Sequence, residues 1–147
     1  MQTIRLPNGV TVFERGWLSA NNILLCDDDQ ATLIDSGYVK HQAQTLALVD
    51  EALQGRPLDL LVNTHLHSDH CGGNRALQMQ YPNLQTRIPP GSSAHVKSWS
   101  EASLSYVATG QNCPVFHFTG LLLAGEQHRW ANMMWEVHAA PGHDPHS

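Results

Sequence analysis

The sequence has little positive charge. Of its 147 residues only 8 are Lys or Arg, against 13 Asp or Glu, and the formal net charge is −5. No basic cluster occurs along the chain. Nucleic acids and anionic membranes are bound mainly by clustered lysine and arginine, so this distribution argues against both. We therefore expect a small-molecule substrate and no nucleic-acid or membrane partner.

Long apolar runs and cysteines are scarce as well. No stretch approaches the roughly 18 apolar residues of a membrane-spanning helix. The first residues also lack the basic and apolar regions of a signal peptide. The three cysteines, Cys26, Cys71 and Cys113, are odd in number and widely separated. This pattern fits a reducing compartment better than a disulfide framework, so we expect a cytoplasmic location.

Histidine is abundant in an otherwise ordinary composition. Hydrophobic residues make up 41% and charged residues 14%, as in soluble globular domains, but the chain has 10 histidines. Imidazole is the commonest metal ligand in proteins, so the excess directs attention to histidines with ligand spacing.

The pattern of secondary structure is mixed. A hairpin of Asn22–Cys26 and Ala31–Asp35 precedes a helix from about Val39 to Leu53, whose apolar residues recur with helical period. The nearly continuous apolar run Leu58–Asn63 is typical of a strand covered on both faces. Further predicted elements are strands at Thr3–Leu6, Gly9–Glu14, Gln85–Ile88 and Val115–Phe118, a helix ending near Gln80, another within Ser92–Tyr106, and a hairpin of Gln127–Trp130 and Met133–His138. Together they predict α/β layers rather than an all-β barrel.

The segment His65-Leu66-His67-Ser68-Asp69-His70 places four potential ligands directly after the buried strand. If it is extended, His65, His67 and Asp69 point to one side, because side chains alternate along a strand. His70 joins them only if the chain turns, and the following Gly72-Gly73 would permit that. Imidazoles and a carboxylate at a strand end predict a first-row metal site, with zinc as first choice. The alternative is a polar loop of solvated histidines.

These residues carry a family resemblance. The segment from Thr64 to Gly73 resembles the signature loop of the metallo-β-lactamase fold, which supplies ligands to two metal ions. The resemblance implies that His65 and His67 bind the first metal and that Asp69 and His70 bind the second. It also implies a catalytic role for Asp69, which would orient the attacking water or relay its proton.

Two other segments resemble motifs of the same family. Pro141-Gly142-His143 resembles its next metal motif, which would make His143 the third imidazole on the first metal. Leu33-Ile34-Asp35-Ser36-Gly37 resembles an earlier motif, whose Asp supports the metal loop without touching the metal. By its residue type alone, Asp35 would be a helix cap or turn former. Asp144 departs from the Thr of many members, and both a partner for an imidazole and a turn residue remain open for it.

The implied fold is a four-layer αββα sandwich built from two similar halves. Residues 1–147 would represent its N-terminal half, a mixed sheet covered by helices, and Ser147 directly follows the third metal motif. We therefore expect a domain truncated at its C-terminal side, without the family's later ligands to the second metal. Such a half would leave part of a sheet face uncovered, and self-association through that face is expected.

The resemblance implies a hydrolase with one or two zinc ions, with iron or manganese as alternatives. A zinc ion with three histidine ligands lowers the pKa of water from 15.7 to about 7. We expect small esters, thioesters or lactones as substrates, since the negative net charge of the chain disfavours nucleic acids. Two alternatives stay open. One is an iron-dependent sulfur dioxygenase, which shares the His-x-His-x-Asp-His loop. The other is a non-catalytic, truncated half-domain.

Overall fold

A computed structural model describes residues 5–147. Six strands form one sheet in sequence order: β1 (Val10–Phe13), β2 (Asn22–Cys26), β3 (Ala31–Ile34), β4 (Leu60–Val62), β5 (Gln85–Ile88) and β6 (Gly120–Leu121). The helices are α1 (Gln42–Leu53), α2 (Ser68–Cys71), α3 (Asn74–Gln80), α4 (Ser93–Ser98) and α5 (Tyr106–Thr109), with 3-10 turns at Val39–His41 and Pro90–Ser92. A separate hairpin pairs β7 (Gln127–Trp130) with β8 (Met133–Glu136).

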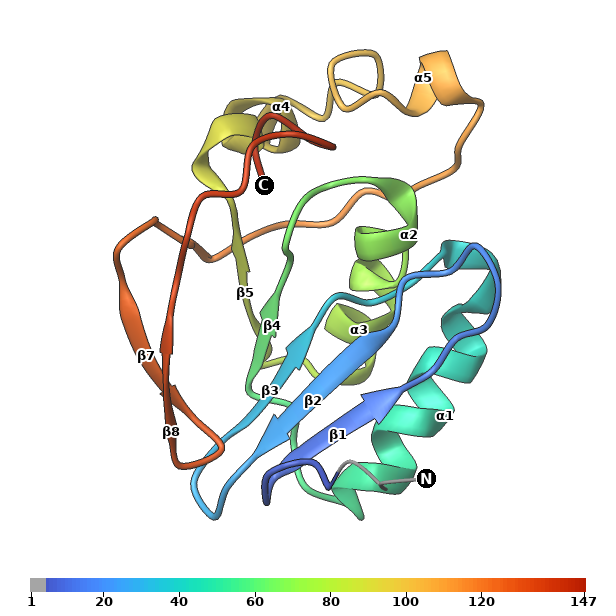
Figure 1. Ribbon diagram of the computed structural model, residues 1–147. Coiled ribbons are helices and arrows are strands. Elements are labelled where there is room, and N and C mark those ends of the chain that lie inside the picture. Colours follow the sequence, from blue (N-terminus) through green and yellow to red (C-terminus); the bar gives the residue numbers. More distant parts are fainter. Residues whose placement is uncertain (1–4) are drawn as a thin grey trace.

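The sheet changes direction after its third strand. The pairs β1–β2 and β2–β3 are antiparallel, whereas β3–β4, β4–β5 and β5–β6 are parallel. The carboxyl ends of β3 to β6 therefore meet at one edge, at the top of Figure 1, where α2, α4 and the C-terminal tail also lie. Loops that follow neighbouring parallel strands are the usual places for binding sites.

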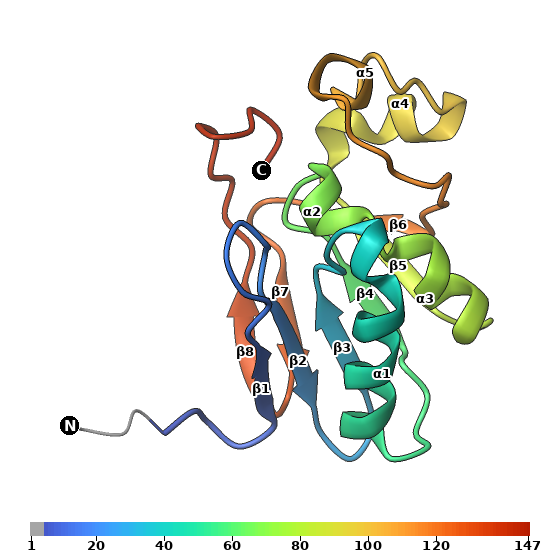
Figure 2. The same ribbon diagram turned by 90° about the vertical axis from the view of Figure 1, so that its right-hand side faces the viewer.

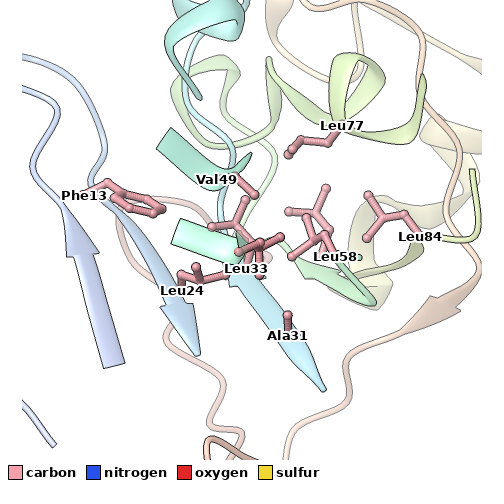
Figure 3. Packing of buried hydrophobic residues seen from close by; sticks show 10 residues of the cluster. Phe13, Leu24, Ala31, Leu33, Val49, Leu58, Leu77 and Leu84 are labelled. Carbon is pink, nitrogen blue, oxygen red and sulfur yellow. The ribbon is translucent and has the colours of Figure 1, made fainter. Parts of the chain in front are cut away.

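The main core fills the space between the sheet and its helices. Leu24 and Leu33 of the sheet pack against Val49 of α1 and Leu77 of α3, as Figure 3 shows. Leu58, which precedes β4, belongs to the same cluster. Burial of such side chains is the main force that holds the layers together.

The opposite face of the sheet is covered by the β7–β8 hairpin (Figure 2). Leu61 of β4 belongs to the helix-side core, whereas Leu60 and Val62 pack with Trp130 and Ala131 of the hairpin. The prediction that this strand is covered on both faces is therefore confirmed. At β4 the cover comes from the chain's own hairpin, and self-association stays a prediction.

Two predicted strands differ from the structure. Of Thr3–Leu6, residues 3 and 4 lie outside the described residues, and Arg5 and Leu6 are not in a strand. Val115–Phe118 is not a strand either, and the sheet ends instead with β6. The reason is that Phe116 is buried with the side chains of Val96 and Tyr106, so its apolar character reflects packing under α4 and α5.

No helix among the described residues has the length and apolarity needed to cross a membrane.

Candidate metal centre

The histidine loop bends at Thr64, at His65 and at His67. That residue has extended backbone angles, φ −67° and ψ 149°, and α2 begins at the next residue. Its carbonyl oxygen accepts hydrogen bonds from the backbone N–H groups of His70, at 2.9 Å, and Cys71, at 3.2 Å. The condition under which Asp69 would point to the same side as His65 and His67, an extended segment, is therefore not met, because α2 begins at Ser68.

The paired glycines serve close packing rather than flexibility. A Cβ atom on Gly72 would lie 2.5 Å from the backbone nitrogen of Val39, and one on Gly73 would meet the carbonyl oxygen of Ser36. The backbone N–H of Gly73 donates to the carbonyl of Gly37 at 3.0 Å. Only glycine allows α2 to approach the loop after β3 this closely.

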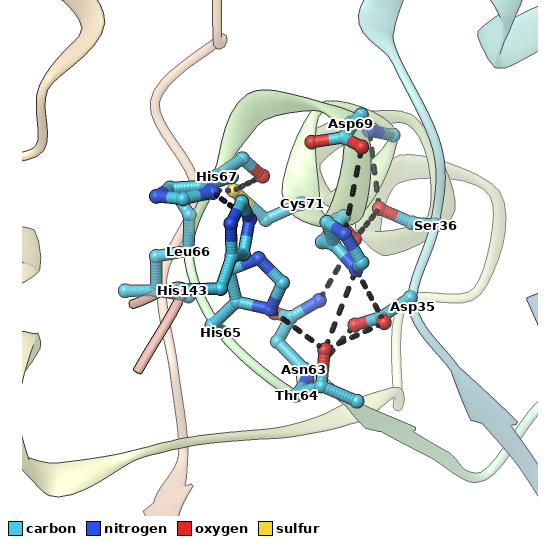
Figure 4. Close-up of polar contacts among 12 residues, drawn as sticks. Asp35, Ser36, Asn63, Thr64, His65, Leu66, His67, Asp69, Cys71 and His143 are labelled. Atoms are coloured by element: carbon cyan, nitrogen blue, oxygen red, sulfur yellow. Dashed lines mark hydrogen bonds and ion pairs between the residues drawn. The ribbon is translucent and has the colours of Figure 1, made fainter. Parts of the chain in front are cut away.

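Three imidazoles converge beside this loop, as Figure 4 shows. One ring nitrogen from each of His65, His67 and His143 lies within 4.8 Å of the other two. The Nδ1 atom of His67 is 3.0 Å from the Nε2 atom of His143, which reaches the site from the tail after β8. The structure thus brings together three residues that the sequence analysis proposed for the first metal.

His65 is the buried member of the group. Its Nδ1 atom is 3.0 Å from the hydroxyl oxygen of Thr64, and that hydroxyl donates to Asp35 at 2.8 Å. The hydroxyl therefore accepts from Nδ1–H, which leaves Nε2 with a lone pair. Nε2 is buried and has no hydrogen-bond partner. Burial, followed by the charges of His70 and His67, lowers the pKa of His65 to about 4, so its ring is neutral at pH 7.

Asp35 organises the buried side of the site. Its carboxylate accepts from the backbone N–H of Thr64 at 2.9 Å, from the Thr64 hydroxyl at 2.8 Å, and from Nδ1 of His70 at 2.7 Å. Asp35 follows β3 and Thr64 follows β4, and the parallel pairing of these strands brings them together. The left-handed backbone of Asp35, φ 62°, is one that Asp adopts more readily than most residues.

Asp69 and His70 lie beside the three imidazoles but make other contacts. The Nε2 atom of His70 is 3.4 Å from a carboxylate oxygen of Asp69, and its ring is 3.9 Å from that of His65, centre to centre. Burial lowers the pKa of His70, but its hydrogen bond to Asp35 and the charges of Asp35 and Asp69 outweigh this and raise it. Among the described residues, the converging group has no fourth member.

A buried polar network beneath the loop was missed by sequence analysis. Asn63 donates to the carbonyl oxygen of His70 at 3.1 Å, Asn74 donates to Asn63 at 2.7 Å, and the Ser36 hydroxyl donates to Asn74 at 2.7 Å. All three side chains are fully buried. They link β3, β4 and α3 to the backbone of α2. In the sequence, the only feature that could have indicated this network is the presence of polar residues next to apolar strands.

Cys71 is not part of the converging group of imidazoles. Its thiol is fully buried, 3.2 Å from the hydroxyl of Tyr106 and 3.8 Å from the thiol of Cys113. Burial raises its pKa well above the ordinary value. It is a packing residue behind the loop rather than a ligand.

The residues fit a zinc ion. Three histidine ligands at Zn–N distances of about 2.0–2.1 Å leave ring nitrogens about 3.3 Å apart in a tetrahedral site. The separation of 3.0 Å between His67 and His143 is close to this value. The buried Nε2 of His65 lacks a partner within the protein, which a metal ion would supply. A cavity of about 180 Å³ adjoins the site and is lined by Tyr38, His67, Ser68, Asp69, Leu104, Ser105, Tyr106, Thr109 and Gln111.

Comparisons with known proteins identify a family model and related sequences. The family model described as "Metallo-beta-lactamase superfamily" matches residues 15–147. The hydroxyacylglutathione hydrolase of Stenotrophomonas maltophilia is 37% identical over 67 residues, which are 46% of this chain and 24% of that protein. The enzyme of the same name from Synechocystis sp. is 37% identical over 71 residues, or 26% of its length. The matched segments thus cover about a quarter of the length of these curated relatives.

Solved structures match over nearly the whole chain. The MIM-2 metallo-beta-lactamase has a TM-score of 0.77 at 25% identity, covering 97% of this chain and 53% of its own. BJP-1, a subclass B3 metallo-beta-lactamase of Bradyrhizobium japonicum, also has a TM-score of 0.77, at 16% identity and with the same coverage. The predicted fold is therefore confirmed, and the chain spans about half the length of these structures.

Proposed function

The chain belongs to the metallo-beta-lactamase superfamily, and on this basis we propose that it forms the zinc-binding centre of a hydrolase of small thioesters, with esters and lactones as related substrates. The observation that carries the proposal is the convergence of His65, His67 and His143 around a buried Nε2 atom that has no protein partner. Such a site is costly to bury unless a ligand completes it.

In this proposal His65, His67 and His143 hold the first zinc ion, which supplies Lewis acidity that lowers the pKa of water to about 7. Asp69 and His70 are the chain's contribution to a second ion. Asp69 lines the adjoining cavity, where its carboxylate oxygen would accept the proton that the attacking water loses. Asp35 holds the His65 and His70 rings in place through the contacts described above.

A thioester is favoured over the other substrates by the sequence comparisons. The curated relatives at 37% identity are named for hydroxyacylglutathione, in which glutathione carries the acyl group on sulfur. The solved beta-lactamases are 25% identical or less in the two cases described. The adjoining cavity combines hydroxyl and amide groups of Ser105, Thr109 and Gln111 with apolar surface, which suits a polar acyl group.

The test is metal analysis together with turnover. The 147-residue chain is purified, its zinc and iron are measured by mass spectrometry, and hydrolysis of an S-acylglutathione is compared with that of a β-lactam and a lactone. His65→Ala should abolish zinc binding and thioester hydrolysis, whereas the control His95→Ala, in α4, should change neither.

Three results would contradict the proposal in different ways. Stoichiometric iron would favour the sulfur dioxygenase. Zinc binding without turnover of any substrate would favour a non-catalytic half-domain. Preferential β-lactam hydrolysis would move the substrate from thioesters to cyclic amides.

A further inference from the structure

The C-terminal tail brings a second carboxylate to the imidazole site. One carboxylate oxygen of Asp144, Oδ2, lies 3.2 Å from the Nε2 atom of His67. The other, Oδ1, accepts the backbone N–H of His146 at 2.6 Å. The two roles that the sequence left open for Asp144, imidazole partner and turn residue, thus belong to its two different oxygens.

For a neutral ring, the contacts of His67 with Asp144 and His143 allow one assignment of its ring proton. An ionised carboxylate is only an acceptor, so the Nε2 atom that faces Asp144 must carry the proton. A neutral imidazole then has its lone pair on Nδ1. Nδ1 is the atom that faces His143 at 3.0 Å, so it accepts a hydrogen bond from the His143 ring. The opposite assignment would place a lone pair on Nε2 against the carboxylate.

We infer that Asp144 is a positioning residue that holds His67 with Nε2 protonated and the Nδ1 lone pair directed into the three-imidazole site. The inference rests on the proposed function, because the tautomer of His67 matters only where a metal ion binds. A metal ion binds the unprotonated nitrogen of a neutral imidazole. Carboxylates beside the outer nitrogen of a ligating histidine fix its tautomer and its ring orientation.

Substitutions at Asp144 separate its two roles. Asp144→Ser keeps an oxygen that can accept the His146 N–H in the same kind of turn. Its side chain is one bond shorter, so it loses the contact with His67. Asp144→Asn keeps the reach, but when its single oxygen stays on His146 its NH₂ group faces His67. That group donates to Nε2 and favours the proton on Nδ1, which opposes metal binding.

A matched control is available on the β7 side of the molecule. Glu126 also places a carboxylate oxygen beside a histidine Nε2 outside the imidazole site, in a hydrogen bond with His128 at 3.0 Å. Glu126→Gln changes the net charge by the same amount as Asp144→Asn. It therefore reports any general effect of charge on zinc affinity.

Two measurements on the full chain test the inference. In the metal-free chain, ¹⁵N NMR at a pH above the ordinary histidine pKa of about 6.5 should find His67 protonated on Nε2, and on Nδ1 in Asp144→Asn. Competition with a chromophoric chelator should find zinc affinity about 10- to 100-fold weaker in Asp144→Ser and Asp144→Asn, and unchanged in Glu126→Gln.

A metal-free wild-type chain with His67 protonated on Nδ1 would overturn the inference, whatever its zinc affinity. So would Asp144 variants that bind zinc as tightly as Glu126→Gln. Failure of the proposed function is distinguishable, because there the wild-type chain itself would fail to bind zinc while the tautomer of His67 could still be measured.

Discussion

The imidazole site has a buried side and an exposed side, and on each side a carboxylate acts on a histidine ring. On the buried side, the carboxylate of Asp35 acts on His65 through Thr64, and the Asp35 and His65 residues are only 4% and 7% exposed. On the other side, Asp144 contacts His67 directly, with side chains 15% and 32% exposed. The first pair is built by adjacent strands, and the second by a tail that follows the β7–β8 hairpin (Figures 1 and 4).

The difference lies in what each carboxylate supports. Asp35 is buried and accepts three hydrogen bonds that also join the loops after β3 and β4, so its loss leaves buried polar groups unsatisfied. Water can replace much of what Asp144 provides, because exposed ion pairs contribute little to stability. We therefore expect the buried side to govern both folding and metal binding, and the exposed side to govern metal binding alone.

The largest effect is expected from Asp35→Asn. Asparagine tolerates the left-handed backbone but has one acceptor oxygen for three donors. Each buried group left unsatisfied costs about 1–3 kcal/mol, so the free energy of unfolding of the metal-free chain should fall by at least that much. Urea unfolding measures the change, and zinc affinity should fall with it. An unchanged unfolding midpoint would show that the two sides do not differ as described.

His143→Ala should affect only metal binding. The residue is exposed and lies in the tail, where substitutions typically change stability by less than about 0.5 kcal/mol. Zinc affinity should fall further than the about 10- to 100-fold expected for a partner outside the ligand set, because a ligand itself is removed. Urea unfolding and chelator competition on one preparation provide the check. A large loss of metal-free stability would place the tail within the folded core.

Thr64→Val tests the connection between Asp35 and His65. Valine keeps the shape and leaves the backbone bond to Asp35 intact, but it removes the hydroxyl that donates to Asp35 and accepts from His65 Nδ1. Each hydrogen bond contributes about 0.5–1.5 kcal/mol, so the loss of two should lower the free energy of unfolding by about 1–3 kcal/mol in urea unfolding. The Nε2 lone pair of His65 should no longer be favoured, which ¹⁵N NMR would detect. Retention of the wild-type tautomer would mean that burial alone determines it.

The last prediction concerns how the stability of the metal-free chain depends on pH. His65 has its pKa lowered to about 4, so its contribution to stability is complete above the unfolded value of about 6.5 and is lost as the pH falls toward 4. His70 has a raised pKa, so its contribution is complete below about 6.5 and is lost as the pH rises through that raised value. The two losses lie on opposite sides of pH 6.5, so the metal-free chain should be most stable near that pH. NMR titration of each ring resolves them, and a His65 that gains its proton near pH 6.5 would contradict the burial of its ring.

Patterns within single elements were readable from the sequence. The β2–β3 and β7–β8 hairpins, helix α1 and strand β4 were predicted because apolar runs, turn residues and helical period act over a few neighbouring residues. The histidine spacing and the order of the motifs singled out the same three imidazoles that converge in the structure. The family and its fold followed from the same residues.

Contacts between elements were decided only by the tertiary structure. The parallel pairing of β3 with β4 places Asp35 beside Thr64 and His70, and the return of the tail places Asp144 beside His67. Helix α2 begins at Ser68, so Asp69 lies within the helix whereas His65 and His67 precede it. None of these distances follows from spacing along the chain, because they depend on which strands pair and on how close two glycines let α2 approach. Local sequence thus determined which side chains were available for the site, and the packing of the layers determined which nitrogen of each ring faces it.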